Sequence, residues 1–328
     1  MRRRTLLAAL AGAVGVSGCS AGGDRPGTPT ATAAPVPTGT PVSESLAPVA
    51  AAPCDGPSFG PATRRVVCTG VAGRRSRPVL EEGPAAPPVV LRRSAARLDL
   101  PARFSFALVN RSDVPFVTAR SAWRLWKASE GEWFALSPPD GGEPGPLAPG
   151  TEHRWRLSLG PRLPSGPVRS VGRRGEVAVP ALGAGRYAFT VDGWFPGEGP
   201  DRRTVFQATF DLGGEPLALD PSDRLVDVSV ADGVARGRLR TGCRTCPEAR
   251  YVLEHAPDET PDRRVIPETA VRAEPLRDAL ALAVEHGVDR VELSGRSPGS
   301  PPFGVGDGGY AFEYLATGRV YRVGARVP

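Results

Sequence analysis

The segment RFSFALVN, Arg103–Asn110, decides the predicted fold. Phe104, Phe106 and Leu108 alternate with smaller or polar residues, so an extended chain places all three on one face. The NRSD that begins at Asn110 is typical of a turn. A half-buried strand followed by a turn is therefore predicted here.

The same pattern recurs on the C-terminal side, with turn signals between the strands and no sustained period of 3.6 residues. The 40 glycines and 37 prolines favour turns over long helices. The segment from 76 to 213 is therefore predicted to be an all-β sandwich. Its further predicted strands are Phe116–Thr118, Ala122–Lys127, Glu132–Leu136, His153–Leu159, Glu176–Val179, Arg186–Trp194 and Thr204–Leu212.

After Pro216 the pattern becomes mixed, and residues 214–328 are predicted to form a small α+β domain. One helix is expected to begin near Pro275 and to end at His286 and Gly287. Its predicted apolar stripe is Leu276, Leu280, Ala283 and Val284. The predicted strands are Val226–Val230, Ala235–Leu239, Arg250–His255, Arg264–Ile266, Val288–Leu293, Tyr310–Leu315 and Arg319–Val323.

The N-terminus has the features of an export signal. Arg3 and Arg4 precede the apolar run Leu6–Val16, which is too short to span a hydrocarbon core of about 30 Å. Residues 1–18 are predicted to be a signal peptide. Residues 19–53 are rich in proline and threonine and lack aromatic residues, so they are predicted to be a disordered tether.

The sequence Val16-Ser17-Gly18-Cys19 resembles the lipobox of bacterial and archaeal lipoproteins, and the arginine pair resembles a twin-arginine export signal. The resemblance implies cleavage before Cys19 and lipid attachment to its thiol. The protein is then expected on the extracytoplasmic face of the cell membrane, held there by a lipid anchor.

Four cysteines follow, Cys54, Cys68, Cys243 and Cys246. An even number in an exported chain favours disulfides, and sequence order favours Cys54 with Cys68 and Cys243 with Cys246, although three pairings are possible. The first bridge would close a connector over residues 54–75. The CxxC at Cys243 is also compatible with thiol redox chemistry, but no strand leads into a helix there, so a stapled loop is preferred. A zinc site would need further ligands nearby.

The predicted sandwich is similar to bacterial immunoglobulin-like domains. The resemblance rests on Phe106 to Ser112, on the Trp-bearing strand with Trp123 and Trp126, and on Gly185–Phe189. It implies an exported domain without catalysis. Tyr187 then occupies a tyrosine-corner position, where its hydroxyl bonds back to the backbone near the strand start. The C-terminal helix and closing hairpin resemble a small domain of haloarchaeal exported proteins without assigned function.

Several motifs resemble catalytic sites but lack the required context. Of the two GxSxG matches, Gly295–Gly299 has Pro298 after the serine, which removes an oxyanion-hole N–H, and Gly56–Gly60 leads into no helix. The glycine-rich Gly304–Gly309 precedes a strand. The three histidines, His153, His255 and His286, show no metal-ligand spacing. No catalytic residue, metal or cofactor is predicted.

Asn110-Arg111-Ser112 is an N-glycosylation sequon on a predicted turn, and an Asn that caps its own turn explains it equally well. The net charge of +6 falls to +3 once Arg2, Arg3 and Arg4 are removed, which does not indicate nucleic-acid binding.

These features predict a lipid-anchored surface protein with a non-catalytic binding or scaffolding role. The expected partner is an envelope protein or a polysaccharide, bound by strand edges or loops. Two alternatives remain open. One is an envelope enzyme or a thiol oxidoreductase using Cys243 and Cys246, and the other is a carrier of a ligand between the two domains.

Overall fold

The structure is a computed structural model that describes residue 57 and residues 63–68, 88–121, 123–136, 142–162, 171–173, 176–240, 245–296 and 309–326. Three sheets contain most of the described secondary structure, so the predicted mainly-β fold is confirmed. Residues Pro48–Pro328 belong to one compact unit. Among the described residues, no helix is both long enough and apolar enough to span a membrane.

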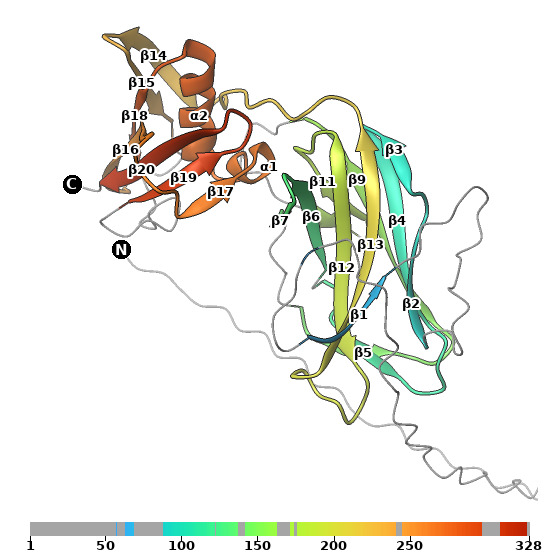
Figure 1. The fold of residues 1–328 in the computed structure, drawn as a ribbon. Helices are drawn as coiled ribbons and strands as arrows, with labels where there is room; N and C mark the ends of the chain where they lie inside the picture. Colours follow the sequence, from blue (N-terminus) through green and yellow to red (C-terminus); the bar gives the residue numbers. More distant parts are fainter. Residues whose placement is uncertain are drawn as a thin grey trace, which may run out of the picture. The chain divides into compact units, whose positions relative to one another are not determined.

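Two facing sheets form the sandwich (Figure 1). The larger has the order β1 (Thr63–Cys68), β13 (Arg203–Gly213), β12 (Gly185–Trp194), β5 (Phe116–Thr118) and β8 (Gly145–Leu147), with β3 (Arg97–Asp99) beside β13, β6 (Arg124–Ser129) beside β12 and β7 (Glu132–Ala135) beside β6. The smaller has the order β10 (Val171–Arg173), β11 (Glu176–Val179), β9 (Glu152–Leu159), β4 (Ala102–Asn110) and β2 (Val89–Arg93).

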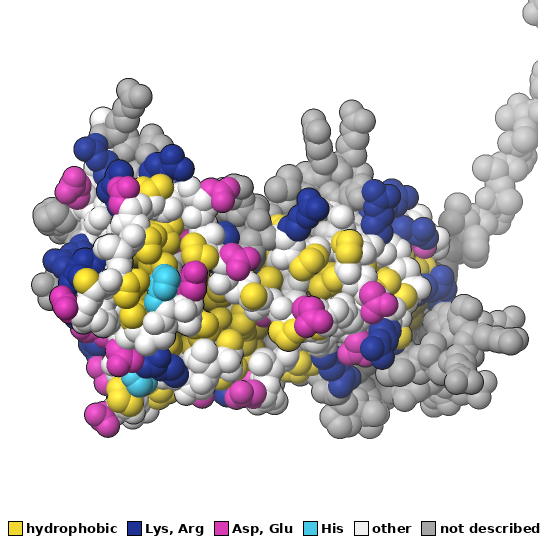
Figure 2. All heavy atoms as spheres, turned by 90° about the horizontal axis from the view of Figure 1, so that it is seen from above, with side chains coloured by type: hydrophobic (Ala, Val, Ile, Leu, Met, Phe, Trp, Pro, Cys, Tyr) yellow, Lys and Arg dark blue, Asp and Glu magenta, His cyan; other side chains and the backbone are white. Residues whose placement is uncertain are grey.

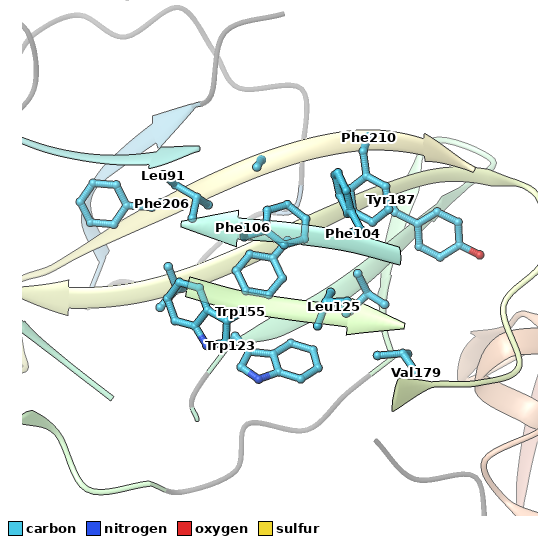
Figure 3. Packing of buried hydrophobic residues seen from close by; sticks show 14 of the residues in the cluster. Leu91, Phe104, Phe106, Trp123, Leu125, Trp155, Val179, Tyr187, Phe206 and Phe210 are labelled. Carbon is cyan, nitrogen blue, oxygen red and sulfur yellow. The ribbon is translucent and has the colours of Figure 1, made fainter. Parts of the chain in front are cut away.

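Aromatic side chains from both sheets fill the sandwich core (Figure 3). Phe106 of β4 is fully buried, and its ring stacks on Phe189 of β12 with the centroids 4.0 Å apart. Phe104 meets Phe106 edge-on at 4.5 Å. The alternation in Arg103–Asn110 therefore has the predicted consequence, because every second side chain of β4 enters the core.

Residues 54–75, predicted to be a connector, contribute a strand to the larger sheet. β1 pairs in parallel with β13, and Val66 lies opposite Val205. Four other short strands, β2, β3, β8 and β10, were also not predicted. β2 begins with the continuous apolar run Val89–Leu91, and all three of these residues are buried. Such a run lacks the alternation that identifies a half-buried strand.

The third sheet contains most of the C-terminal residues, in the order β14 (Leu225–Ala231), β15 (Val234–Leu239), β18 (Arg290–Arg296), β16 (Glu248–His255), β20 (Arg319–Arg326), β19 (Tyr310–Tyr314) and β17 (Arg263–Val265). Two helices, α1 (Pro267–Ala270) and α2 (Glu274–His286), lie between β17 and β18 in sequence. α2 ends as predicted, since Gly287 adopts the left-handed conformation with φ 62°.

The predicted apolar stripe of α2 is correct at three of its four positions. Leu276, Leu280 and Ala283 are buried in the core of the third sheet, but Val284 is 51% exposed. Val284 begins the exposed C-terminal end of α2, since residues 284–287 are all exposed. The buried face before it is wider than the predicted stripe, because Ala279, Ala281 and Leu282 are buried as well.

The opposite side of α2 is covered by the segment that joins the sandwich to the third sheet. The carboxylate of Asp278 accepts hydrogen bonds from the Ser222 N–H at 2.6 Å and from the Ser222 hydroxyl at 2.9 Å. Arg277 donates to the carbonyl of Asp220 at 2.8 Å. Burial raises the pKa of Asp278, and the bonds from Ser222 oppose this shift. Polar side chains of the helix thus fasten the joining segment.

Candidate functional site

The predicted cysteine sites lie mostly outside the described residues. Cys19, Cys54 and Cys243 are among the residues that the structure does not describe. Cys68 is the last residue of β1, and its backbone lies opposite Gln207. Cys246 lies two residues before β16 and is disulfide-bonded. The predicted pairings therefore stay predictions.

Asn110 is fully buried and fastens its own turn. Its side-chain amide donates to the carbonyl of Val114 at 2.8 Å and to that of Leu147 at 2.9 Å. Its Oδ1 accepts from the N–H and the hydroxyl of Ser112. This geometry favours the turn-capping interpretation, because a glycan on Nδ2 would have to displace both amide bonds.

Replacing Asn110 with alanine is expected to lower the free energy of unfolding by about 1–3 kcal/mol, because the buried bond to the Leu147 carbonyl is lost and the Val114 carbonyl keeps only the Ser112 hydroxyl of its two side-chain donors. Urea denaturation of the two proteins measures the change. Ser112→Ala is the control and should cost less, since it leaves both amide bonds intact. Equal stability of the Asn110 variant and the parent, or a glycan found on Asn110 by mass spectrometry, would contradict the capping role.

Each of the three histidines lies beside another side chain or at the end of the helix α2. His153 is half-buried beside Trp155, with the ring centroids 4.5 Å apart, and burial lowers its pKa, as does the nearby Arg120. His255 Nδ1 lies 3.4 Å from Asp289 Oδ1, and His286 is in the last turn of α2. Within the described ranges, no three His, Cys, Asp or Glu side chains lie close enough together to hold a metal ion. The serines of both GxSxG motifs lie outside those ranges.

The main polar cluster of the described chain joins the sandwich to the third sheet. Glu268 of α1 has no solvent exposure. Its Oε1 forms an ion pair with Lys127 of β6, the one lysine of the sequence, and accepts the Gly183 N–H at 3.1 Å. A Cβ at Gly183 would lie only 2.2 Å from the Leu217 nitrogen, so the close approach of these backbones requires glycine.

Tyr187 and Arg272 complete this junction. The Tyr187 hydroxyl donates to the Gly183 carbonyl at 2.7 Å, four residues upstream, which confirms the hydrogen bond predicted for a tyrosine corner. Burial, together with the charge of Glu268, raises the pKa of Tyr187. Arg272 donates to the carbonyls of Glu268 and Pro180, and burial lowers its pKa to about 10. These side chains contact one another and hydrogen-bond to the backbone of α1 and of residues 180–183, which precede β12.

A second ionic contact lies nearer the surface. Arg264 of β17 pairs with Glu130 and Glu132 at the turn between β6 and β7, and with Glu313 of β19. Both ionic contacts use the β6–β7 hairpin, which therefore ties the sandwich to the third sheet.

Sequence reasoning did not identify this junction. Lys127 and Glu268 are separated by 141 residues, and neither lies in a recognisable motif. One available signal was compositional, since a single lysine in a chain that otherwise uses arginine marks Lys127 as unusual.

No protein-family model and no curated protein matches this sequence. Solved structures that match include an alkylpurine DNA glycosylase of Pseudomonas fluorescens, with a TM-score of 0.21, 16% identity, and coverage of 39% of this chain and 31% of that one. A β-glucosidase of Erythrobacter marinus has a TM-score of 0.21, 16% identity, and coverage of 38% and 15%. This chain spans less than a third of either protein, and likenesses this weak indicate nothing about its function.

Proposed function

We propose that the protein is a lipid-anchored surface protein of the cell envelope with a non-catalytic binding or scaffolding role. The anchoring rests on the predicted lipobox that ends at Cys19. The scaffolding role rests on the buried junction, which is the observation that carries the proposal. There the carboxylate of Glu268 forms an ion pair with Lys127 of the sandwich and accepts a hydrogen bond from the Gly183 N–H.

A buried ion pair of this kind favours one arrangement of its elements, because separating the partners leaves an uncompensated charge in a water-poor site. A junction with that property suits a protein whose task is to present sheet surfaces in a fixed geometry. The predicted partner is an envelope protein or a polysaccharide, and sheet faces and edges are suitable surfaces for either.

The proposal is tested by producing the full chain in a prokaryotic host with lipoprotein processing and separating it by detergent-phase partition. The parent is expected in the detergent phase with Cys19 as its first residue, and Cys19→Ala is expected in the aqueous phase. The parent should also capture a partner from solubilised native envelope. A mature product that begins at Met1, or a parent that stays in the aqueous phase, would overturn the anchoring.

The same preparation separates binding from the thiol-oxidoreductase alternative. Cys243→Ser with Cys246→Ser should leave partner capture intact and lower only the melting temperature, because a disulfide stabilises chiefly by restricting the unfolded chain. Thiol–disulfide exchange activity in the parent that disappears in this variant would contradict a non-catalytic role.

A further inference from the structure

The smaller sheet of the sandwich has an outer face that is rich in arginine. Alternate residues of β2, β4 and β9 enter the core, so the residues between them point outward. We define the outer arginine face by four of these outward residues: Arg92 of β2, Arg103 of β4, and Arg154 and Arg156 of β9. Arg92 is half-buried, and the other three are exposed.

The register of the sheet places these four arginines close together. Arg92 and Arg154 lie on either side of Ala107, each directly opposite it. Since neighbouring strands are about 4.8 Å apart, the backbones at these two arginines are about 10 Å apart. Arg156 follows Arg154 two residues later on the same face, and Arg103 lies diagonally across from it on β4. The four side chains therefore stand over one patch of the sheet.

Most of the charge on this patch is not neutralised. Glu152 pairs with Arg154 at 2.7 Å, and both side chains are largely exposed. Within the part of the chain that the structure describes, no carboxylate forms an ion pair with Arg92, Arg103 or Arg156. Three guanidinium groups are thus available to an external anion.

The exposed arginines of the third sheet differ in this respect. Arg238 pairs with Asp227, and Arg250 pairs with Glu292. On the sandwich, even when Glu176 is counted because it lies opposite Arg156 on β11, four arginines face two carboxylates. In Figure 2, the charged side chains along the upper edge of the sandwich, on the right of the picture, are mostly Lys and Arg.

The chemistry of the patch suits phosphate groups that are presented on a surface. A guanidinium group is planar and binds phosphate oxygens through two parallel N–H donors. The side chains between the arginines, Ser105 and Ala107, are small, so the long arginine side chains extend beyond them. Several arginines on one sheet face can then contact several headgroups of a lipid surface at the same time.

The position of the sandwich in the chain places a membrane nearby. The predicted tether ends at residue 53, and β1 of the sandwich begins at Thr63. A coil of about 35 residues spans on the order of 30 Å. A chain anchored at Cys19 would therefore hold the sandwich close to the bilayer, where the high effective concentration makes a weak contact sufficient.

We propose that the outer arginine face docks the sandwich on the anionic phospholipid headgroups of the membrane that holds the anchor. This inference rests on the proposed anchoring, which supplies the membrane, and it adds a second contact with that membrane. The docked sandwich would lie with its smaller sheet toward the bilayer. The third sheet would then be left to meet other partners.

The test uses the chain from residue 19 onward with Cys19→Ala, which carries no lipid and keeps the compact unit Pro48–Pro328. Sedimentation with vesicles measures its binding. Vesicles of phosphatidylcholine with phosphatidylglycerol are expected to bind the chain, less strongly as salt is added, and vesicles of phosphatidylcholine alone are not.

Arg103→Gln with Arg156→Gln is expected to weaken binding to the phosphatidylglycerol vesicles by at least about tenfold, because two arginines near the anionic surface are lost. Arg156→Gln alone should give an intermediate loss. The matched control is Arg238→Gln with Arg250→Gln, which removes the same charge from exposed positions of the third sheet and should bind like the parent. Unchanged melting temperatures show that the variants fold.

Equal weakening by the two pairs would overturn the proposal, since binding would then follow overall charge. Release of the chain from the vesicles by polygalacturonate or single-stranded DNA, at an equal concentration of charge, would overturn it as well. Detergent-phase partition of the lipidated full chain tests the anchoring separately. A parent that enters the detergent phase but shows no preference for phosphatidylglycerol overturns this inference alone, whereas a parent that stays in the aqueous phase overturns the anchoring on which it rests.

Discussion

Replacing Lys127 with methionine is expected to lower the free energy of unfolding by about 3–5 kcal/mol. The substitution removes the cation from a carboxylate that has no solvent exposure, and it leaves Glu268 Oε1 with the hydrogen bond from the Gly183 N–H. An unpaired charge in such a site is far more costly than the pair is favourable, because desolvation of the carboxylate is no longer compensated. Denaturation by urea measures the loss.

The double variant Lys127→Met with Glu268→Gln separates the charge effect from packing. It should recover part of the stability, because a neutral amide is cheaper to bury than a carboxylate. Arg154→Met serves as the surface control and should leave the melting temperature nearly unchanged, since Arg154 and its partner Glu152 are both exposed and exposed ion pairs contribute little. A Lys127 variant as stable as the parent would show that the junction does not hold the two elements together.

Replacing Phe106 with alanine is expected to cost about 3–5 kcal/mol of unfolding free energy, through the lost ring and the cavity that remains. Phe106 is the central ring of the sandwich core. It stacks on Phe189 at 4.0 Å, and it meets Phe104 at 4.5 Å and Phe210 at 5.7 Å in edge-on contacts. The partners come from β4, β12 and β13, so the cavity would weaken both sheets.

Phe106→Leu is the graded control and should cost less than the alanine variant, because more of the volume is retained. Val114→Ala, at a side chain that is 43% exposed, should change the unfolding midpoint little. A loss of under 1 kcal/mol for Phe106→Ala would mean that neighbouring rings collapse into the space, and that the aromatic cluster does not determine how the sheets pack.

The strands predicted from alternation are present in the structure. Arg103–Asn110 corresponds to β4, Phe116–Thr118 to β5, and Glu176–Val179 to β11. Strands that are buried on one side carry this signal because their side chains point alternately to core and solvent. β8 was missed because Gly145 and Pro146 are residues that favour turns over strands. α1 was missed because its four residues make barely one turn.

The candidate sites were only partly predictable. Asn110 was identified as a turn residue or a sequon, and only its buried amide bonds to Val114 and Leu147 favour the first interpretation. Arg236 and Arg238 of β15 alternate in the sequence with Ala235, Gly237 and Leu239, but Ser294 of β18 and Arg250 of β16 come to lie beside β15 only through sheet order. That order places β18 between β15 and β16, which no local pattern specifies.

Local alternation, turn residues and helix-ending signals determined the strands, the helix α2 and the mainly-β class, because each of these depends on residues within a few positions of one another. The tertiary structure decided that Lys127 meets Glu268 across 141 residues, and that Arg238 and Arg250 flank Ser294. Contacts of this kind depend on which surfaces pack together, and packing is set by burial summed over the whole chain rather than by neighbouring residues.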